Sequence, residues 1–111
     1  MTGITTHVLD TARGRPAAAV DVTLERLSDA GQWGVVSAGR TDDDGRLTAL
    51  TGVVMPGVYR LRFETAVYFR AQGTRAFHPH VSIAFDVAEG EAHVHVPLLL
   101  SAFGYTTYRG S

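Results

Sequence analysis

Hydrophobic and polar residues alternate along most of this chain with a period of two, not with the longer period of a helix. Successive side chains of a β-strand point to opposite faces, so this alternation predicts strands that bury one face. The segment 47–57 alternates more weakly and ends at a Pro-Gly pair. Clear runs of this kind occupy residues 4–10, 20–27, 33–41, 58–64, 81–87 and 93–100.

One segment, 64–73, breaks the alternation. It lies between two strand-like runs and contains no turn signal before Gly73, which favours a short helix of about two turns. Clusters of Asp, Gly and Ser separate the other runs and are typical of turns. Seven or eight strands with one short helix predict an all-β fold, an antiparallel β-sandwich or barrel.

Length and composition limit the possible classes of protein. The chain has 111 residues, so we expect a single domain spanning 1–111. Hydrophobic residues make up 45% and charged residues 19%, which is typical of a globular chain. The net charge is −1 and the arginines are scattered, so we expect no nucleic-acid partner. A domain of this size buries its surface incompletely, and association of subunits would help it.

The chain contains no cysteine, which excludes disulfides, thiolate metal sites and a cysteine nucleophile. No segment approaches the ~18 apolar residues of a membrane-spanning helix. The first ten residues lack the basic start and apolar stretch of a secretory leader. We therefore expect a soluble, cytoplasmic protein with no membrane partner.

The first candidates for functional residues are the five histidines. His93 and His95 are two residues apart and project from one face of a predicted strand, while His7 is in the middle of another. Such a pair could bind zinc, although no third ligand is marked, or could transfer protons near neutral pH. A polar strand face against water or a neighbouring subunit is the third interpretation. His78 and His80 lie in a predicted loop.

A second candidate is Arg46, at the end of the acidic turn 41–46. The acidic spacing does not match a calcium-binding EF-hand loop, and an Asp/Gly turn is the better interpretation. The turn places Arg46 at the entrance of a strand, where its guanidinium could bind an anionic or carbonyl-rich ligand. Since the chain has no phosphate loop and no nucleophile elbow, an enzyme of this kind would activate water directly.

The end of the chain is unusual in composition. Its last nine residues include Phe103, Tyr105, Tyr108 and Arg109, whereas chain ends are commonly poorly ordered. We therefore expect the tail to have a binding role.

Four stretches taken together, THVLDTARGRPAAAVDVTLERL at 6–27, TDDDGR at 41–46, HVPLLLS at 95–101 and YRGS at 108–111, resemble the 5-hydroxyisourate hydrolase family of transthyretin-related proteins. The resemblance covers residues 4 to 111. The terminal YRGS is its most specific element, since transthyretin proper lacks it and binds thyroid hormone.

The resemblance implies a two-sheet, transthyretin-like β-sandwich with one short helix, assembled as a homotetramer. It implies hydrolysis of the six-membered ring of 5-hydroxyisourate to 2-oxo-4-hydroxy-4-carboxy-5-ureidoimidazoline in urate degradation, with no metal and no cofactor. The family's catalytic histidine on the first strand corresponds to His7, its turn arginine to Arg46, and its second histidine to His95. Which histidine is the general base stays open.

The family's tail motif corresponds to Tyr108, Arg109, Gly110 and Ser111, and the resemblance implies that these residues pack at a subunit interface and bind substrate. Arg109 would then offer a forked donor to the ligand, and Ser111 would lie close to the pocket. One departure is His80, where many relatives have an acidic residue, which we interpret as a loop change. His93 lies outside the match and is left without a catalytic role.

Two other classes of function remain as alternatives. A transthyretin-like binding protein without chemistry would share the fold, but would not need His7, Arg46, His95 and the tail motif. A metal-dependent hydrolase would be built on the His-x-His strand, and metal content would test it.

Overall fold

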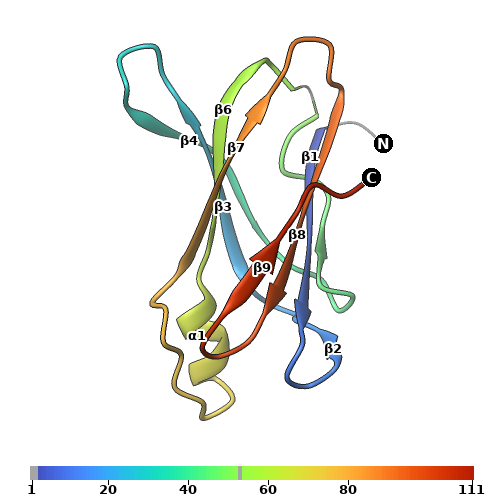
Figure 1. Ribbon diagram of the computed structural model, residues 1–111, viewed down its shortest axis with the longest axis vertical. Coiled ribbons are helices and arrows are strands. Elements are labelled where there is room, and N and C mark those ends of the chain that lie inside the picture. The colour runs from blue at the N-terminus through green and yellow to red at the C-terminus, as the bar shows by residue number, and fades with distance from the viewer. Residues whose placement is uncertain (1–2, 53) are drawn as a thin grey trace.

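Two β-sheets pack face to face, and the computed structural model describes them over residues 3–52 and 54–111 (Figure 1). One sheet has the strand order β4-β3-β6-β7, formed by Trp33–Arg40, Asp21–Leu27, Gly57–Phe63 and Val81–Val87. The other has the order β2-β1-β8-β9, formed by Arg15–Pro16, Gly3–Asp10, His93–Leu100 and Tyr105–Thr107, with β5 (Arg46–Leu47) also paired to β1. The predicted β-sandwich is confirmed.

The core lies between the two sheets and follows the predicted alternation. In β8, Val94, Val96 and Leu98 are buried while His93 and His95 are half-buried on the opposite face. The same rule places alternate apolar residues of the facing sheet inward. The largest fully buried side chains include Phe63, Ile4, Leu24, Leu61, Leu98 and Leu100.

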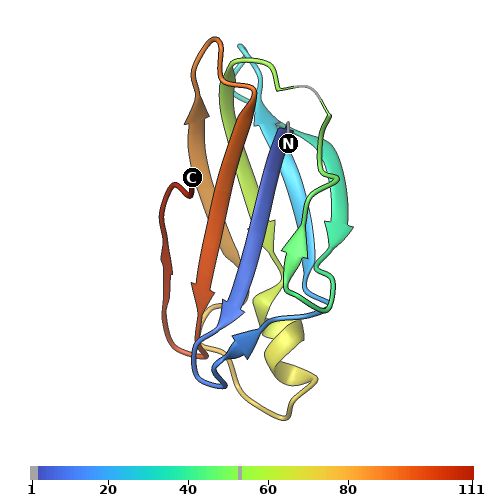
Figure 2. The same ribbon diagram turned by 90° about the vertical axis from the view of Figure 1, so that its right-hand side faces the viewer.

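One strand pair departs from the antiparallel expectation. β1 and β8 run parallel over their whole lengths, from Gly3 opposite His93 to Asp10 opposite Leu100 (Figure 2). Parallel neighbours need a long crossover connection. Most of the chain separates these two strands in sequence, which supplies that connection. The alternation of each strand is unaffected, so the pattern alone does not reveal the direction of pairing.

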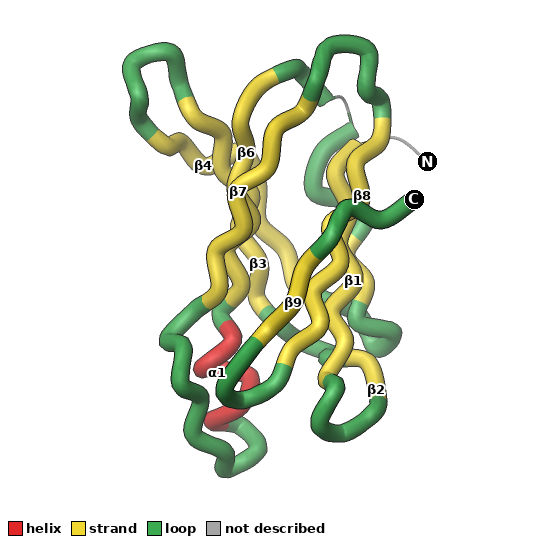
Figure 3. Tube along the Cα trace, viewed as in Figure 1, coloured by secondary structure: helices red, strands yellow, loops and turns green. Residues whose placement is uncertain are grey.

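The helix α1 (Thr65–Arg70) is shorter than the predicted 64–73 (Figure 3). It buries Phe69, and the Tyr68 hydroxyl donates to Asp10 Oδ2 at 2.8 Å. Burial, followed by this hydrogen bond, raises the pKa of Tyr68. Asp10 is buried and also accepts from the Arg13 backbone N–H. The helix therefore anchors the end of β1.

The tail contains a strand that the sequence did not predict. β8 ends at Leu100 as expected, but after a turn β9 pairs with it, placing Thr107 opposite Leu98 and Tyr105 opposite Leu100. Tyr and Thr favour strands, yet a run of three residues is too short to show alternation. With the two-residue strand β2, this takes the described residues beyond the expected seven or eight strands.

The other predicted runs coincide with strands whose first or last residues differ slightly from the predicted ones. The weak run 47–57 contributes Leu47, which with Arg46 forms β5, and Gly57, which begins β6, while residue 53 lies outside the described residues. Within the described residues, no helix is both long enough and apolar enough to span a membrane.

The outer face of the β4-β3-β6-β7 sheet carries several ion pairs, and Val35 and Val36 of β4 are also exposed. The Arg60 guanidinium donates to both carboxylate oxygens of Glu25, at 2.9 and 3.0 Å, and stacks over the Trp33 ring at 4.2 Å. Two further pairs lie on the same sheet or at its end, Arg40 with Asp21 and Arg62 with Glu64. This face is therefore charged and open to water.

Candidate active site

A pocket of about 190 Å³ lies on the outer face of the β1–β8 sheet. Its position follows from the alternation of β8, since the two histidines point away from the core that the valines occupy. Its walls are formed by Thr5, Thr6, Arg46, Thr48, His93, His95 and Ser111. Three candidate residues from the sequence therefore meet here, namely Arg46, His95 and Ser111.

The strand register brings these residues together. Thr5 lies opposite His95 in the parallel β1–β8 pair, and His7 lies opposite Arg46 in the antiparallel β1–β5 pair. β5 is only two residues long, but it follows the Asp/Gly turn directly. One central strand thus has the arginine on one side and the histidine pair on the other.

The turn before β5 is held by its own side chains. Asp42 Oδ1 accepts the backbone N–H groups of Asp44 at 2.9 Å and Arg46 at 3.0 Å. Gly45 has a φ of +75°, and a Cβ there would lie 2.3 Å from the Val8 carbonyl oxygen. Only glycine fits this close approach. The turn is therefore structural, as the sequence indicated, and its effect is to orient Arg46.

His7 lies beside this pocket and is not among the residues that form its walls. Its Nε2 is 2.9 Å from the Asp44 carbonyl oxygen. A carbonyl only accepts, so Nε2 carries a proton in this contact. The free nitrogen of His7 is therefore Nδ1.

The histidine pair shares one hydroxyl. Thr5 Oγ1 lies 2.8 Å from Nδ1 of His95 and 3.2 Å from Nε2 of His93. The two imidazole rings are 6.3 Å apart and inclined by 30°. Sequence reasoning missed Thr5 and set His93 aside. No local signal reveals this contact, because it depends on the register between the first and the eighth strand.

The surroundings of His95 favour its neutral form. Burial is the main cause that lowers its pKa, and the neighbouring charges of His93, His7 and Arg46 lower it further. A neutral imidazole has a lone pair at one nitrogen near neutral pH, as a general base requires.

The backbone of the tail contacts the backbone of β8 at this site. The Gly110 N–H donates to the His95 carbonyl oxygen at 2.9 Å. A Cβ on Gly110 would lie 2.5 Å from His95 Cδ2, so a larger residue would force the ring or the tail to move. This contact places Ser111 in the pocket wall.

Arg109 and Tyr108 are placed differently from Ser111. The Arg109 guanidinium pairs with the Glu91 carboxylate, which also accepts the Ala88 N–H at 2.8 Å. The Ala88 hydrogen bond, then Arg109, lower the pKa of Glu91. Tyr108 and Arg109 instead line a second cavity of about 310 Å³, which lies between β7, β8 and the tail and shares His95 with the pocket.

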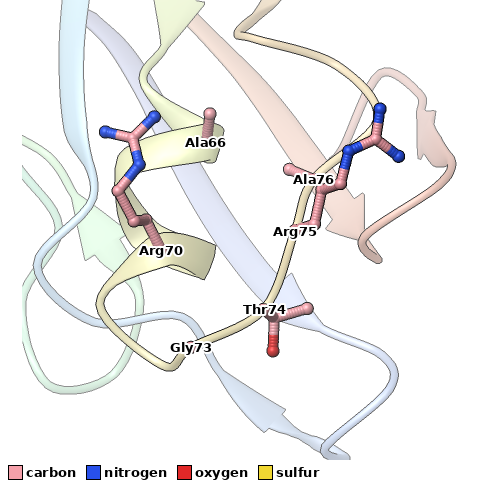
Figure 4. A pocket seen from close by; sticks show the side chains of 6 residues that line it. All are labelled: Ala66, Arg70, Gly73, Thr74, Arg75 and Ala76. Carbon is pink, nitrogen blue, oxygen red and sulfur yellow. The ribbon is translucent and has the colours of Figure 1, made fainter.

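A larger hollow of about 400 Å³ lies beside α1, and its lining contains no histidine (Figure 4). It is lined by Ala66, Arg70, Gly73, Thr74, Arg75 and Ala76. Figure 4 shows the guanidinium groups of Arg70 and Arg75 on opposite sides of it. This hollow contains no general base, so the smaller histidine pocket is the better candidate for chemistry.

The described residues do not provide a complete set of side-chain ligands for a metal ion. Among the residues that the structure describes, no three His, Cys, Asp or Glu side chains are grouped so that they could hold an ion. The His-x-His pair therefore has no third protein ligand of these types within the described ranges.

The sandwich and its histidine–arginine pocket define a transthyretin-like protein. A family model described as the HIUase/Transthyretin family matches residues 4–110, and the chain belongs to this family.

Several relatives are named 5-hydroxyisourate hydrolase. The one from Salmonella dublin is 43% identical over 110 residues, covering 97% of this chain and 80% of that protein. The one from Mus musculus is 42% identical over 111 residues, covering 97% and 94%. Among solved structures, sea bream transthyretin in complex with thyroxine has a TM-score of 0.92 and 34% identity, covering 96% of this chain and 93% of its own.

The surroundings of His95 predict how it titrates. We expect its midpoint in a proton NMR titration to lie below 6.5, because burial and the electrostatic influence of His93, His7 and Arg46 oppose its charged form. Since the folded-state pKa is the lower one, its contribution to the free energy of unfolding is full above 6.5 and is lost as the pH falls. Arg46→Gln should raise the midpoint only slightly, as burial is the larger cause. A His95→Asn spectrum assigns the signal, and a midpoint at or above 6.5 would contradict the prediction.

Proposed function

We propose that this protein hydrolyses 5-hydroxyisourate to 2-oxo-4-hydroxy-4-carboxy-5-ureidoimidazoline in urate degradation, without a metal or a cofactor. The observation that carries the proposal is the meeting of His95, Arg46 and Ser111 around one pocket, with His7 opposite Arg46. The relatives named 5-hydroxyisourate hydrolase support the substrate.

The chemistry needs only groups that this pocket supplies. Water attacks the lactam carbonyl, and its oxygen forms the new bond to carbon. The carbonyl oxygen becomes negative, and the Arg46 guanidinium stabilises this charge. His95, neutral because of its lowered pKa, takes the proton from water at Nε2. The C–N bond then breaks, and the leaving nitrogen receives a proton.

We assign the delivery of that proton to protonated His95, or to His7 in its imidazolium form, in which Nδ1 also carries a proton. His7 is oriented by the hydrogen bond of its Nε2 to the Asp44 carbonyl, and we assign contact with the ligand to its other ring nitrogen, Nδ1. Substrate binding is assigned to the same three groups, His7, Arg46 and His95. The tail residues Tyr108, Arg109, Gly110 and Ser111 complete the binding set, with Ser111 in the wall of the histidine pocket and Tyr108 and Arg109 in the adjoining cavity.

The second candidate is a transthyretin-like protein that binds a small ligand without chemistry. The likeness to sea bream transthyretin with thyroxine favours it, because one fold can host both functions. The polar pocket argues against it, since a ligand channel has no need of a lowered histidine pKa beside an arginine.

A spectroscopic assay with freshly generated 5-hydroxyisourate separates these functions. Turnover that exceeds spontaneous hydrolysis and survives treatment with a chelator supports the proposal. Binding without turnover would support the transthyretin-like alternative. Activity that is lost with a chelator and restored by zinc would favour the metal-dependent hydrolase.

We also propose a homotetramer in the cytoplasm. Large apolar side chains are exposed on the tail and the loop beside it, with Phe103 67% and Phe77 62% exposed. Such patches are typical of interfaces. Light scattering should give a mass of four chains, and a single-chain mass for the active protein would contradict this. Cell fractionation tests the compartment.

Removal of either histidine should lower turnover while leaving the sandwich folded. We expect His7→Ala and His95→Ala each to reduce kcat by roughly 10²–10⁴, the usual range for a lost acid–base group. Both side chains lie outside the core, so the far-ultraviolet circular dichroism should not change. His78→Ala is the matched control, as this loop histidine lies outside the pocket. Near-normal kcat in a folded variant would exclude the histidine concerned from the mechanism.

Deletion of residues 108–111 should abolish most activity with little loss of stability. β9 ends at Thr107, so the strand pairing survives while the Gly110–His95 contact and the Ser111 wall are lost. Steady-state kinetics beside thermal unfolding measures both effects. A folded truncation with unchanged kcat/KM would show that the tail is dispensable.

The same kinetic measurements can distinguish two roles of Arg109, holding the tail through Glu91 and binding substrate. If Arg109 only holds the tail through Glu91, Glu91→Gln should lower kcat/KM as much as Arg109→Ala does. If Arg109 also binds substrate, Arg109→Ala should be clearly worse than Glu91→Gln. Arg109→Lys then tests whether the planar fork of the guanidinium matters beyond its charge.

A further inference from the structure

Thr5 lies between His93 and His95. It was assigned neither to the catalytic residues nor to the substrate-binding residues. Its side chain is 1% exposed, and its hydroxyl is within hydrogen-bond distance of Nδ1 of His95 and Nε2 of His93. The β1–β8 register holds it opposite His95. A buried hydroxyl shared by two imidazoles must have a defined direction of donation.

The direction follows from counting protons. A hydroxyl has one proton to donate and lone pairs to accept, and a neutral imidazole has one N–H and one lone pair. Since Thr5 occupies Nδ1 of His95, Nε2 is the nitrogen left to act on a ligand. A general base needs its lone pair there, so Nδ1 must carry the proton and donate it to Thr5. The Thr5 hydroxyl then donates to Nε2 of His93.

We propose that Thr5 is a positioning residue that holds His95 as its Nδ1–H tautomer, with neutral His93 accepting the Thr5 hydroxyl proton. This inference rests on the proposed function and deepens it. When His95 takes a proton from water at Nε2, its Nδ1–H bond to Thr5 is kept. No proton passes through Thr5. The hydroxyl oxygen, polarised by donation to His93, stabilises the positive ring.

In this arrangement, the protonation state of His93 determines whether His95 can act as the general base. If Nε2 of His93 is protonated, it must donate to Thr5, and the Thr5 hydroxyl turns to donate to His95. His95 then carries its proton on Nε2 and has no lone pair toward the ligand. The groups whose positive charge would oppose protonation of His95 are His93, His7 and Arg46, so protonation of His93 also adds unfavourable charge.

The first test needs no variant and no turnover. Nitrogen-15 NMR of the imidazoles in the whole, ligand-free protein at neutral pH reports which ring nitrogen carries the proton. We expect Nδ1–H for both His95 and His93. An Nε2–H tautomer at His95 in the folded wild-type protein would overturn the proposal, whether or not the protein hydrolyses 5-hydroxyisourate. Lack of turnover with the expected tautomers would instead count against the proposed function alone.

The second test uses matched variants at Thr5. Thr5→Val keeps the shape without the hydroxyl, and Thr5→Ser keeps the hydroxyl. We expect Thr5→Val to lose the Nδ1–H preference of His95 and to lower kcat on the order of 10–100-fold, as for other groups that orient a functional histidine. KM should change little. Thr5→Ser should restore both the tautomer and kcat.

A buried threonine elsewhere serves as the control. Thr65 at the start of α1 is 1% exposed, and its hydroxyl has no partner within the described residues. Thr65→Val should leave the tautomer, KM and kcat at wild-type values. If Thr5→Val does not fold, Thr5→Ala replaces it. A folded Thr5 variant without the hydroxyl that keeps the Nδ1–H tautomer and wild-type kcat would overturn the proposal.

Discussion

The parallel register between β1 and β8 is the constraint on which the site depends. It pairs strands from opposite ends of the chain, and β1 also takes β5 as its other neighbour along part of its length. β1 is buried on both faces over most of its length, as befits a central strand. A slip of one residue would turn Thr5 into the core and Ile4 toward the histidines, removing the hydroxyl and exposing an apolar side chain. The packing that stabilises the sandwich therefore also aligns the site.

Polar groups buried along β1 show how this register is specified. The Thr6 hydroxyl donates to the Val96 carbonyl at 2.6 Å, and Asp10 accepts from Tyr68 and the Arg13 backbone. An unpaired buried hydroxyl or carboxylate costs free energy, so each of these contacts disfavours other alignments. Burial of apolar residues stabilises the pairing of β1 with its neighbours, and these polar contacts determine its register.

The sequence predicted local structure well wherever the alternation was long. The expected runs 81–87 and 93–100 coincide with β7 and β8, and the helix was placed correctly but made too long. β9 was missed because three residues cannot show a period. The parallel direction of β1 and β8 was missed because side-chain alternation is the same for either direction. The candidate residues Arg46, His95 and Ser111 came from motifs, yet the contact of Thr5 with both histidines depends on long-range register, which no motif contains.

The ion pairs on the β4-β3-β6-β7 sheet have a consequence for how copies of this chain can meet. Contact through that face would remove water from Glu25, Arg60 and their neighbours, and the desolvation of paired charges commonly outweighs what their attraction returns. The bidentate geometry of Glu25 and Arg60 leaves few donors for a new partner. This desolvation cost disfavours the ion-paired face of the sheet as a contact surface between copies.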